Sequence, residues 1–224
     1  MNNITVLKFG GSVLIDDGAV KNAAEIIKKE YEKGKAVIAV VSAQGGMTDA
    51  LLSEALRLSD KPSKRELDVI MSAGELLSSS KLAIAVGNIG IKSVSLSGFQ
   101  AGIMTSSANG EARIKDIDTA RLKKEISERK VVVAAGFQGV NRHGDMTTLG
   151  RGGSDTTAVA IAAALNAEKC VVYSKVDGIY TADPEKVPDA RKIKEIDYNN
   201  MQELSFLGVK VLNPRAVELA RKYS

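Results

Sequence analysis

The segment of residues 148–158, TLGRGGSDTTA, constrains the fold of this chain more than any other, because a glycine-rich turn leads directly into an alanine-rich stretch. Glycine lets the backbone approach a ligand closely, and the first amides of a helix have no partner inside that helix. The pattern predicts a helix over residues 156–167, capped by Ser154 or Asp155, with an anion-binding N-terminus. Arg151 adds a planar guanidinium that suits a carboxylate or a phosphate. An ordinary capped helix after a glycine turn is the alternative interpretation.

A glycine pair also follows the first apolar run, residues 4–9 (ITVLKF). This run predicts a strand with Lys8 near its end and Gly10 and Gly11 directly after it. Ligands bind at the carboxyl ends of strands in open parallel sheets, so Lys8 could reach a phosphate while the glycine amides donate to it. The segment matches neither the Walker pattern nor the Rossmann fingerprint. In isolation, such a segment is more often a turn than a site.

The composition favours an α/β fold in one domain that spans residues 1–224. Hydrophobic residues make up 44% of the chain, but aromatic residues only 4%, and tryptophan is absent. The core must therefore consist mainly of Ala, Val, Ile and Leu, as in a sheet with helices on both faces.

Strand-like and helix-like patterns alternate along the chain, which predicts a three-layer αβα sandwich around an open, mainly parallel sheet. Residues 105–118 are small and polar and are expected to form a surface excursion, and residues 136–148 a hairpin around His143. The predicted strands are 4–9, 36–42, 93–96, 131–135 and 170–173; the other predicted helices are 19–33, 49–59, 63–86, 119–129, 198–206 and 215–223.

Charge and cysteine content limit the partners and the compartment. The formal net charge is +4, and no basic run is interleaved with aromatic residues, which argues against nucleic-acid binding. Nowhere do 18 apolar residues run together, so no membrane span is expected. The single cysteine, Cys170, lies in a strand-like run and is expected to be a buried, inert thiol in a reducing compartment. We therefore expect a cytoplasmic protein.

Three further stretches could carry chemistry. Residues 42–48 follow the second strand, where hydroxyls and amides would meet a ligand, although a plain connecting loop is as common. Gly74 interrupts a helical pattern at a cost of about 1 kcal/mol relative to alanine, so a close approach is expected there. Its neighbour Glu75 could bind an ammonium group or simply be an exposed helix carboxylate. Residues 176–184 suit a nucleoside because they follow a strand, whereas His143 has no partner motif for catalysis.

Taken together and in order, these motifs resemble the catalytic domain of the aspartokinases, within the amino-acid kinase superfamily. The resemblance covers nearly the whole chain: residues 8–11, 42–48, 74–75, 136–139, 148–158, 176–184 and 209–218. It implies transfer of the γ-phosphoryl group of MgATP to the side-chain carboxylate of L-aspartate, giving 4-phospho-L-aspartate for lysine, threonine and methionine biosynthesis. It also implies that the two substrates meet across the strand ends of the amino-acid kinase fold.

The resemblance implies the following roles for individual residues. Lys8 would neutralise the migrating phosphoryl group and Asp155 would orient Lys8. Thr48 and Arg151 would hold the carboxylate oxygens of aspartate and Glu75 its α-ammonium. The residues on the ATP side would be Lys8, Phe9, Gly10, Gly11, Ser12, Ser42, Gly152, Gly153, Ser154, Ser174, Lys175, Tyr180, Asp183, Lys210 and Val211.

The chemistry fits this set, because a carboxylate acceptor is already ionised at neutral pH and needs no general base. No carboxylate cage for Mg²⁺ is visible in the sequence, so the triphosphate is expected to supply most of the ligands of the ion.

The family normally continues into another strand and two ACT regulatory domains, so the chain is expected to be a stand-alone catalytic unit or a fragment, and to form a homodimer. Two alternatives stay open: a non-catalytic module that binds a nucleotide or an amino acid, and a kinase for another small acid, such as acetylglutamate or a nucleoside monophosphate.

Overall fold

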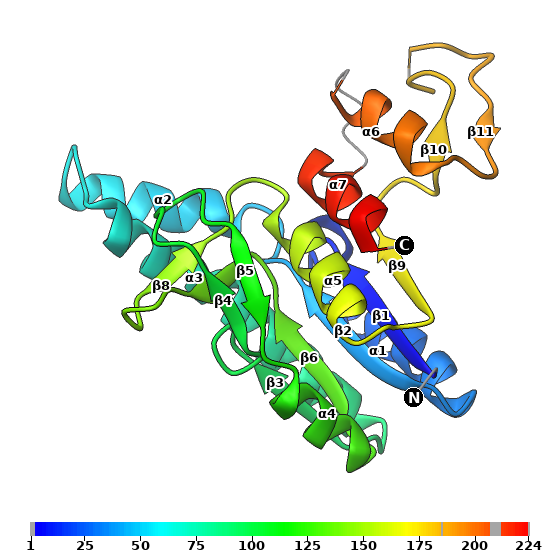
Figure 1. The fold of residues 1–224 in the computed structure, drawn as a ribbon, viewed down its shortest axis with the longest axis horizontal. Helices are drawn as coiled ribbons and strands as arrows, with labels where there is room; N and C mark the ends of the chain where they lie inside the picture. Colours follow the sequence, from blue (N-terminus) through cyan, green and yellow to red (C-terminus); the bar gives the residue numbers. More distant parts are fainter. Residues whose placement is uncertain (1–2, 185, 207–211, 224) are drawn as a thin grey trace.

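The computed structural model describes residues 3–184, 186–206 and 212–223. Within them, a five-stranded parallel sheet in the order β3-β6-β2-β1-β9 forms the centre of the molecule (Figure 1). All five strands coincide with predicted ones to within one residue at each end. They are β1 (Ile4–Phe9), β2 (Ala36–Val41), β3 (Ser93–Leu96), β6 (Val131–Ala135) and β9 (Lys169–Tyr173).

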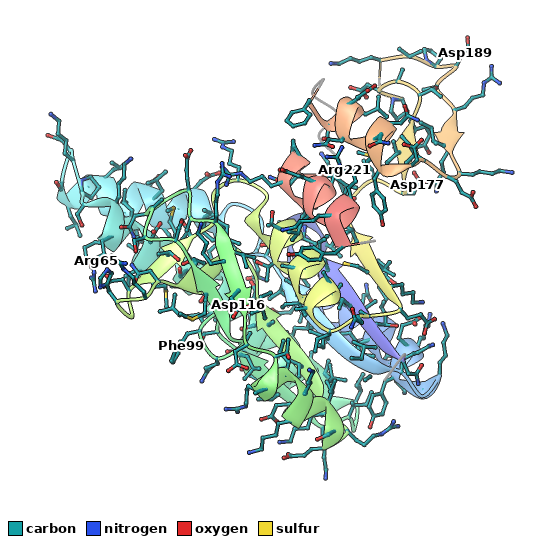
Figure 2. All side chains as sticks on the ribbon, viewed as in Figure 1. Arg65, Phe99, Asp116, Asp177, Asp189 and Arg221 are labelled. Atoms are coloured by element: carbon teal, nitrogen blue, oxygen red, sulfur yellow. The ribbon has the colours of Figure 1, made fainter. Side chains whose placement is uncertain are left out.

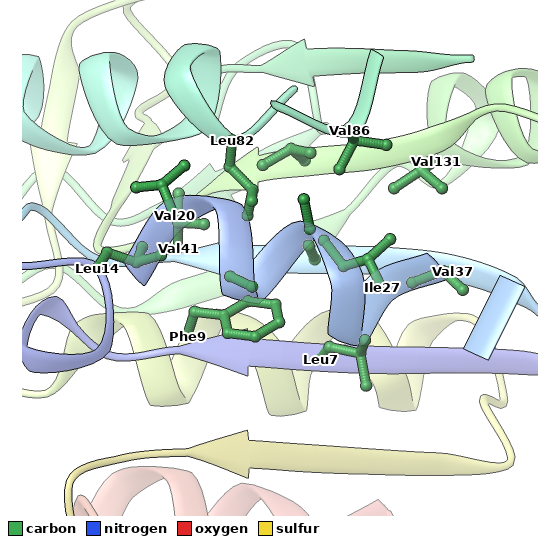
Figure 3. Packing of buried hydrophobic residues seen from close by; sticks show 14 of the residues in the cluster. Leu7, Phe9, Leu14, Val20, Ile27, Val37, Val41, Leu82, Val86 and Val131 are labelled. Atoms are coloured by element: carbon green, nitrogen blue, oxygen red, sulfur yellow. The ribbon is translucent and has the colours of Figure 1, made fainter. Parts of the chain in front are cut away.

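Helices cover both faces of this sheet, which confirms the predicted αβα sandwich. One layer contains α1 (Asp17–Glu32) and α3 (Lys64–Asn88), and the other contains α4 (Ala120–Ser127) and α5 (Gly153–Ala164). Figure 3 shows the first layer, in which Leu82 and Val86 of α3 pack with α1 above the sheet.

The two-residue period of β1 decides which side chain faces which layer. Leu7 and Phe9 belong to the cluster under α1 and α3, whereas Ile4 and Val6 belong to the cluster under α4 and α5. Lys8 follows Ile4 and Val6 at the same two-residue spacing. Its side chain is therefore directed towards the α5 layer at the end of the strand.

Residues 105–118 differ from the prediction, because they are not merely a surface excursion. They contribute to a second sheet in the order β5-β4-β7-β8, and a buried hydrogen bond of 2.6 Å joins Thr105 Oγ1 to Thr147 Oγ1. Strands of three or four residues are too short to show a periodic pattern. The hairpin around His143 is confirmed. The strands are β4 (Ile103–Thr105), β5 (Ile114–Ile117), β7 (Gln138–Val140) and β8 (Met146–Thr148).

The C-terminal part stands beyond the α5 layer, where the orange elements of Figure 1 extend past α7. α7 (Pro214–Tyr223) packs on α5, and α6 (Tyr198–Phe206) packs on α7. The short ribbon of β10 (Ile179–Tyr180) and β11 (Lys192–Ile193) was not predicted. The remaining elements are η1 (Gly11–Val13) and α2 (Met47–Leu58).

α3 has the length and apolar composition of a membrane span, and among the described helices it alone does. Its buried side nevertheless carries two carboxylates, Asp68 and Glu75, together with Leu82 and Val86 of the core. A helix that buries such a stripe against a sheet and another helix is typical of a protein core.

Candidate active site

A cavity of about 810 Å³ opens at the carboxyl ends of β1 and β2, where ligands bind in parallel sheets. It brings together the residues predicted for the acceptor and several of those predicted for the phosphates. These are Lys8, Ser42, Thr48, Glu75, Arg151, Gly152, Gly153 and Ser154.

Lys8 lines this cavity and forms an ion pair with Asp155, with 2.7 Å between Nζ and Oδ1. The two side chains are only 10% and 12% exposed. Asp155 lies on the same side of α5 as Ala158 and Ile161, which pack in the cluster that also receives Ile4 and Val6 of β1. The helical and strand periods thus direct the two charges towards each other, and a cation is held at the floor of the cavity.

Glu75 presents a buried carboxylate to the same cavity. The residue is 3% exposed, and its Oε1 accepts a hydrogen bond of 2.9 Å from the amide of Ala43. Its Oε2 is buried and has no hydrogen-bond partner among the residues that the structure describes. Burial raises the pKa of Glu75 to about 7, although the Ala43 amide acts in the opposite direction. A carboxylate oxygen without a partner in such a place suits a cationic ligand.

Gly74 explains how α3 comes so close to the loop after β2. A Cβ atom at this position would lie 2.7 Å from the Cβ of Ala43, closer than such atoms approach in proteins. The absence of a side chain therefore lets the Ala43 amide reach Glu75. The close approach predicted from this glycine is confirmed.

Thr48 and Arg151 lie at the outer part of the cavity. Thr48 is the second residue of α2, whose N-terminus follows the left-handed Gly46, and it is half-buried. The residue Arg151 is exposed, so its guanidinium stands at the entrance. Ser42, directly after β2, is half-buried beside them. These hydroxyls and the guanidinium line the same cavity as Lys8 and suit an anionic ligand.

The start of α5 differs from the predicted capping. The helix begins at Gly153, its N-cap is Gly152 in the left-handed conformation (φ +67°), and no side chain caps it. Ser154 and Asp155 are therefore within the first turn. A carboxylate there is favoured by the helix dipole, and in this case it pairs with Lys8 instead of an amide.

Two residues before and within α7 hold the glycine turn. Asn213 Nδ2 donates to the carbonyl of Arg151 at 2.6 Å, and Arg215 Nη1 donates to the carbonyl of Leu149 at 3.1 Å. A Cβ at Gly152 would lie 2.3 Å from Asn213 Nδ2, so only glycine fits. The C-terminal segment thereby forms one wall of the cavity.

The first glycine pair plays a largely structural part in this fold. Phe9 is fully buried and its ring stacks on Tyr173 at 5.1 Å, and the Gly10 amide donates to the carbonyl of Tyr173 at 3.1 Å. A Cβ at Gly11 would lie 2.3 Å from the carbonyl oxygen of Ala43. Ser12 is exposed. The Gly10 amide is therefore not free for a phosphate, whereas the close approach at Gly11 keeps the loop after β2 near Lys8.

The residues predicted for the nucleotide side are more dispersed. Ser174 lines a second cavity of about 630 Å³ with Asp177 and Lys192. Tyr180 donates to Asp177 at 2.9 Å, and Figure 2 shows Asp177 beside the β10–β11 ribbon. The residues Lys175 and Asp183 are exposed. Lys210 and Val211 lie outside the described residues.

Phe137 is a cavity residue that sequence reasoning did not single out. It has φ +67°, which is unusual for a bulky side chain, and its ring lies against Gly153. The same bend lets its amide donate to Thr157 Oγ1 and its carbonyl accept from Leu149. The motif at 136–139 drew attention to this turn, but not to its conformation.

Cys170 is half-buried rather than fully buried, and burial raises the pKa of its thiol to about 12. A raised pKa favours the protonated thiol at neutral pH, and the inertness of Cys170 stays a prediction.

No cluster of three or more His, Cys, Asp or Glu side chains able to hold a metal ion occurs in the part of the chain that the structure describes. Asp155, the carboxylate that follows the glycine turn, is already paired with Lys8. The described residues of the cavity offer charged groups and hydrogen-bond donors to a ligand.

The sequence matches the model of the amino acid kinase family over residues 3–224. It is 51% identical to an aspartokinase of Geobacillus stearothermophilus over 98% of this chain and 54% of that protein. The chain thus spans about half the length of the curated relatives it matches.

Solved structures with a similar fold also include aspartokinases. The fold is similar to that of an aspartate kinase from Synechocystis, with a TM-score of 0.86 and 42% identity over 98% of this chain and 36% of that one. It is also similar to Escherichia coli aspartokinase III in complex with aspartate and ADP, with a TM-score of 0.87 and 26% identity over 98% of this chain and 60% of that one.

Proposed function

This chain belongs to the amino acid kinase family, and from that premise we propose that it transfers the γ-phosphoryl group of ATP to the side-chain carboxylate of L-aspartate. The product would be 4-phospho-L-aspartate. The similarity to aspartokinases at about half identity and the charge pattern of the main cavity both support this substrate.

One observation carries the choice of acceptor: the buried Oε2 of Glu75 has no hydrogen-bond partner within residues 3–184, 186–206 and 212–223. An α-ammonium group would satisfy this oxygen and favour the ionised carboxylate, which burial otherwise disfavours. Arg151 and Thr48 stand at the same cavity and are suited to the carboxylates of the acceptor. An acceptor with one ammonium and two carboxylate groups matches this set, whereas an N-acylated acid would leave Glu75 without a cation.

Lys8 would act on the transferred group. Phosphoryl transfer requires alignment and positive charge near the equatorial oxygens rather than a general base, because the acceptor carboxylate is already ionised. Asp155 holds the Lys8 ammonium in place through their ion pair. At the start of α5, the amides of Gly153 and Asp155 already donate to carbonyls of the turn, so the amide of Ser154 would supply the further donor to the phosphates.

ATP would extend from this turn to the second cavity, where it would lie beside Ser174. Mg²⁺ would enter with the phosphates of ATP, whose oxygens supply its ligands and whose charge it partly neutralises. The residues of this chain would orient that complex against the acceptor.

The test is phosphoryl transfer with hydroxylamine in the solution, which traps an acyl phosphate as a hydroxamate. MgATP is supplied with L-aspartate, with N-acetyl-L-aspartate or with acetylglutamate. Hydroxamate formed from L-aspartate alone would support the proposal. Product from an N-acylated acid instead would favour the kinase for another small acid, and nucleotide binding without any product would favour the non-catalytic module.

We further propose that the chain forms one catalytic domain, works in the cytoplasm in amino-acid biosynthesis and associates as a homodimer. Sedimentation velocity over a range of protein concentrations tests the last point. A single species of monomer mass at all concentrations would contradict it.

A further inference from the structure

Asp68 is a fully buried carboxylate that does not line the cavity. It lies on the same side of α3 as Ser72 and Glu75, at the spacing i, i+4 and i+7 that stacks residues on one face of a helix. Asp68 therefore occupies the same buried stripe as Glu75, two turns earlier.

Every side-chain hydrogen bond of Asp68 comes from another segment. The Asn109 side-chain amide donates to Oδ2 at 2.8 Å, and the Gly110 backbone amide donates to Oδ1 and Oδ2 at 3.0 and 3.1 Å. The Thr148 hydroxyl donates to Oδ1 at 2.5 Å. Four short contacts from donors offset the cost of burying a carboxylate and fix its orientation.

The segments that meet at Asp68 all reach the acceptor side of the cavity. α3 carries Glu75, and Thr148 ends β8 three positions before Arg151. Gly110 and Glu111, in the loop between β4 and β5, line the cavity directly. Thr148 also joins this loop through its carbonyl, which accepts from the amide of Ala112 at 2.8 Å.

We propose that Asp68 is a positioning residue for the acceptor: it fixes the loop of residues 106–113 and the end of β8 relative to Glu75. This inference rests on the proposed function for the identity of the acceptor. Asp68 touches none of the reacting groups. Its effect passes through Thr148 to Arg151 and through Gly110 to the wall of the cavity.

Asp68→Asn tests this role with little change in volume, because an amide has one acceptor oxygen where the carboxylate has two. The single oxygen can accept either from Thr148, which donates to Oδ1, or from Asn109, which donates to Oδ2, but not from both. The Gly110 amide donates to both oxygens and keeps one neutral acceptor in either orientation. The KM for L-aspartate should rise about tenfold, while the KM for MgATP changes less than about twofold and kcat falls less than about threefold.

Further variants separate positioning from stability. Asn109→Ala removes one donor to Asp68 from the half-buried loop. It should also raise the KM for aspartate, but by less than Asp68→Asn does. Thr148→Val should also raise it, whereas Thr148→Ser, which keeps the hydroxyl, should restore it. Ser106→Ala is the matched control and should leave the KM unchanged. Within the described part of the chain, Ser106 Oγ accepts only from the amide of Arg113 in the same loop.

A lower melting temperature of Asp68→Asn with both KM values unchanged would overturn the proposal and leave Asp68 a stabilising residue only. Equal rises in both KM values would do the same. If the wild-type chain forms no product with aspartate, the proposed function fails. Amide hydrogen exchange at Gly110 then tests separately whether Asp68 fixes the loop of residues 106–113. The Gly110 amide would donate to one neutral oxygen in Asp68→Asn instead of to a carboxylate, which weakens its hydrogen bond. Faster exchange of this amide in Asp68→Asn than in wild type would therefore support the proposal, and unchanged exchange would overturn it.

Discussion

The ammonium of Lys8 lies 2.7 Å from the carboxylate of Asp155, and neither side chain is more than 12% exposed. The pair joins the end of β1 to the first turn of α5, so two distant segments of the sequence place one cation at the floor of the cavity. In the proposed reaction, Lys8 contacts the phosphoryl group and Asp155 holds the Lys8 side chain in position.

Lys8→Met should lower kcat by about 10²–10³-fold, the usual loss when one charged donor to a transition state is removed. The KM for aspartate should change far less, because Glu75 and Arg151 remain. Steady-state hydroxamate formation measures both parameters. Lys35→Met is the matched control, since Lys35 pairs with Glu168 outside the cavity. An equal loss in the two variants would argue against a specific role for Lys8.

Lys8 and Asp155 should also be coupled in stability. Removing one partner leaves a largely buried charge uncompensated, which costs about 3 kcal/mol, and the double variant Lys8→Met, Asp155→Asn should lose less than the sum of the single variants. Urea unfolding of the four proteins gives the coupling free energy. The exposed pair of Arg57 and Glu54, 3.8 Å apart, should give less than about 0.5 kcal/mol in the same cycle. Simple additivity at Lys8 and Asp155 would contradict the account.

The pKa of Glu75, raised to about 7 by burial, predicts how acceptor use depends on pH. Below this pKa the carboxyl group is protonated and cannot pair with an ammonium. As the pH rises through 7 the ionised form appears, so kcat/KM for aspartate should increase between pH 6 and pH 8 and then level off.

Glu75→Gln should remove this rise and increase the KM for aspartate about tenfold or more. Glu66→Gln, at an exposed position of the same helix, should keep the wild-type profile. The stability of the free protein should change with pH in the opposite direction to kcat/KM. Because the folded-state pKa lies above the ordinary value of 4.5, ionisation of Glu75 makes the free protein less stable as the pH rises from about 4.5 to 7, and Glu75→Gln should weaken that decline.

The two glycines inside α3 should respond in opposite ways to alanine. At Gly74, the new Cβ would lie 2.7 Å from that of Ala43, so the variant should lose about 1–3 kcal/mol of stability and displace the amide that binds Glu75. At Gly87, the nearest atom is 3.9 Å away, so alanine should add up to about 1 kcal/mol. Thermal unfolding compares the two. A stable Gly74→Ala protein with an unchanged KM for aspartate would show that the close approach is dispensable.

Much of the sheet and most residues of the main cavity could be predicted from the sequence, because their signals are local. The apolar run before Lys8 and the glycine turn before Asp155 are each contained in about ten residues. The period of two in β1 and the helical period in α5 then bring the two side chains into the same layer. Glu75 could be selected only through its neighbour Gly74.

The features that sequence reasoning missed depend on distant partners. Asp68 stands among the charges of residues 64–68, a pattern typical of a solvated helix, and its burial follows from donors 41 and 80 positions away. The strands β4 and β5 are too short for a periodic signal. The N-cap of α5 was misassigned because Gly152 adopts a left-handed conformation, which the sequence GGSD does not distinguish from a serine or aspartate cap.

Phosphorus NMR of the purified wild-type chain with MgATP and L-aspartate tests the central claim most directly. The account predicts an acyl phosphate signal that grows together with ADP, requires aspartate and is almost abolished in Lys8→Met. Conversion of ATP to ADP and inorganic phosphate alone, or no turnover by a folded chain that binds both ligands, would contradict it.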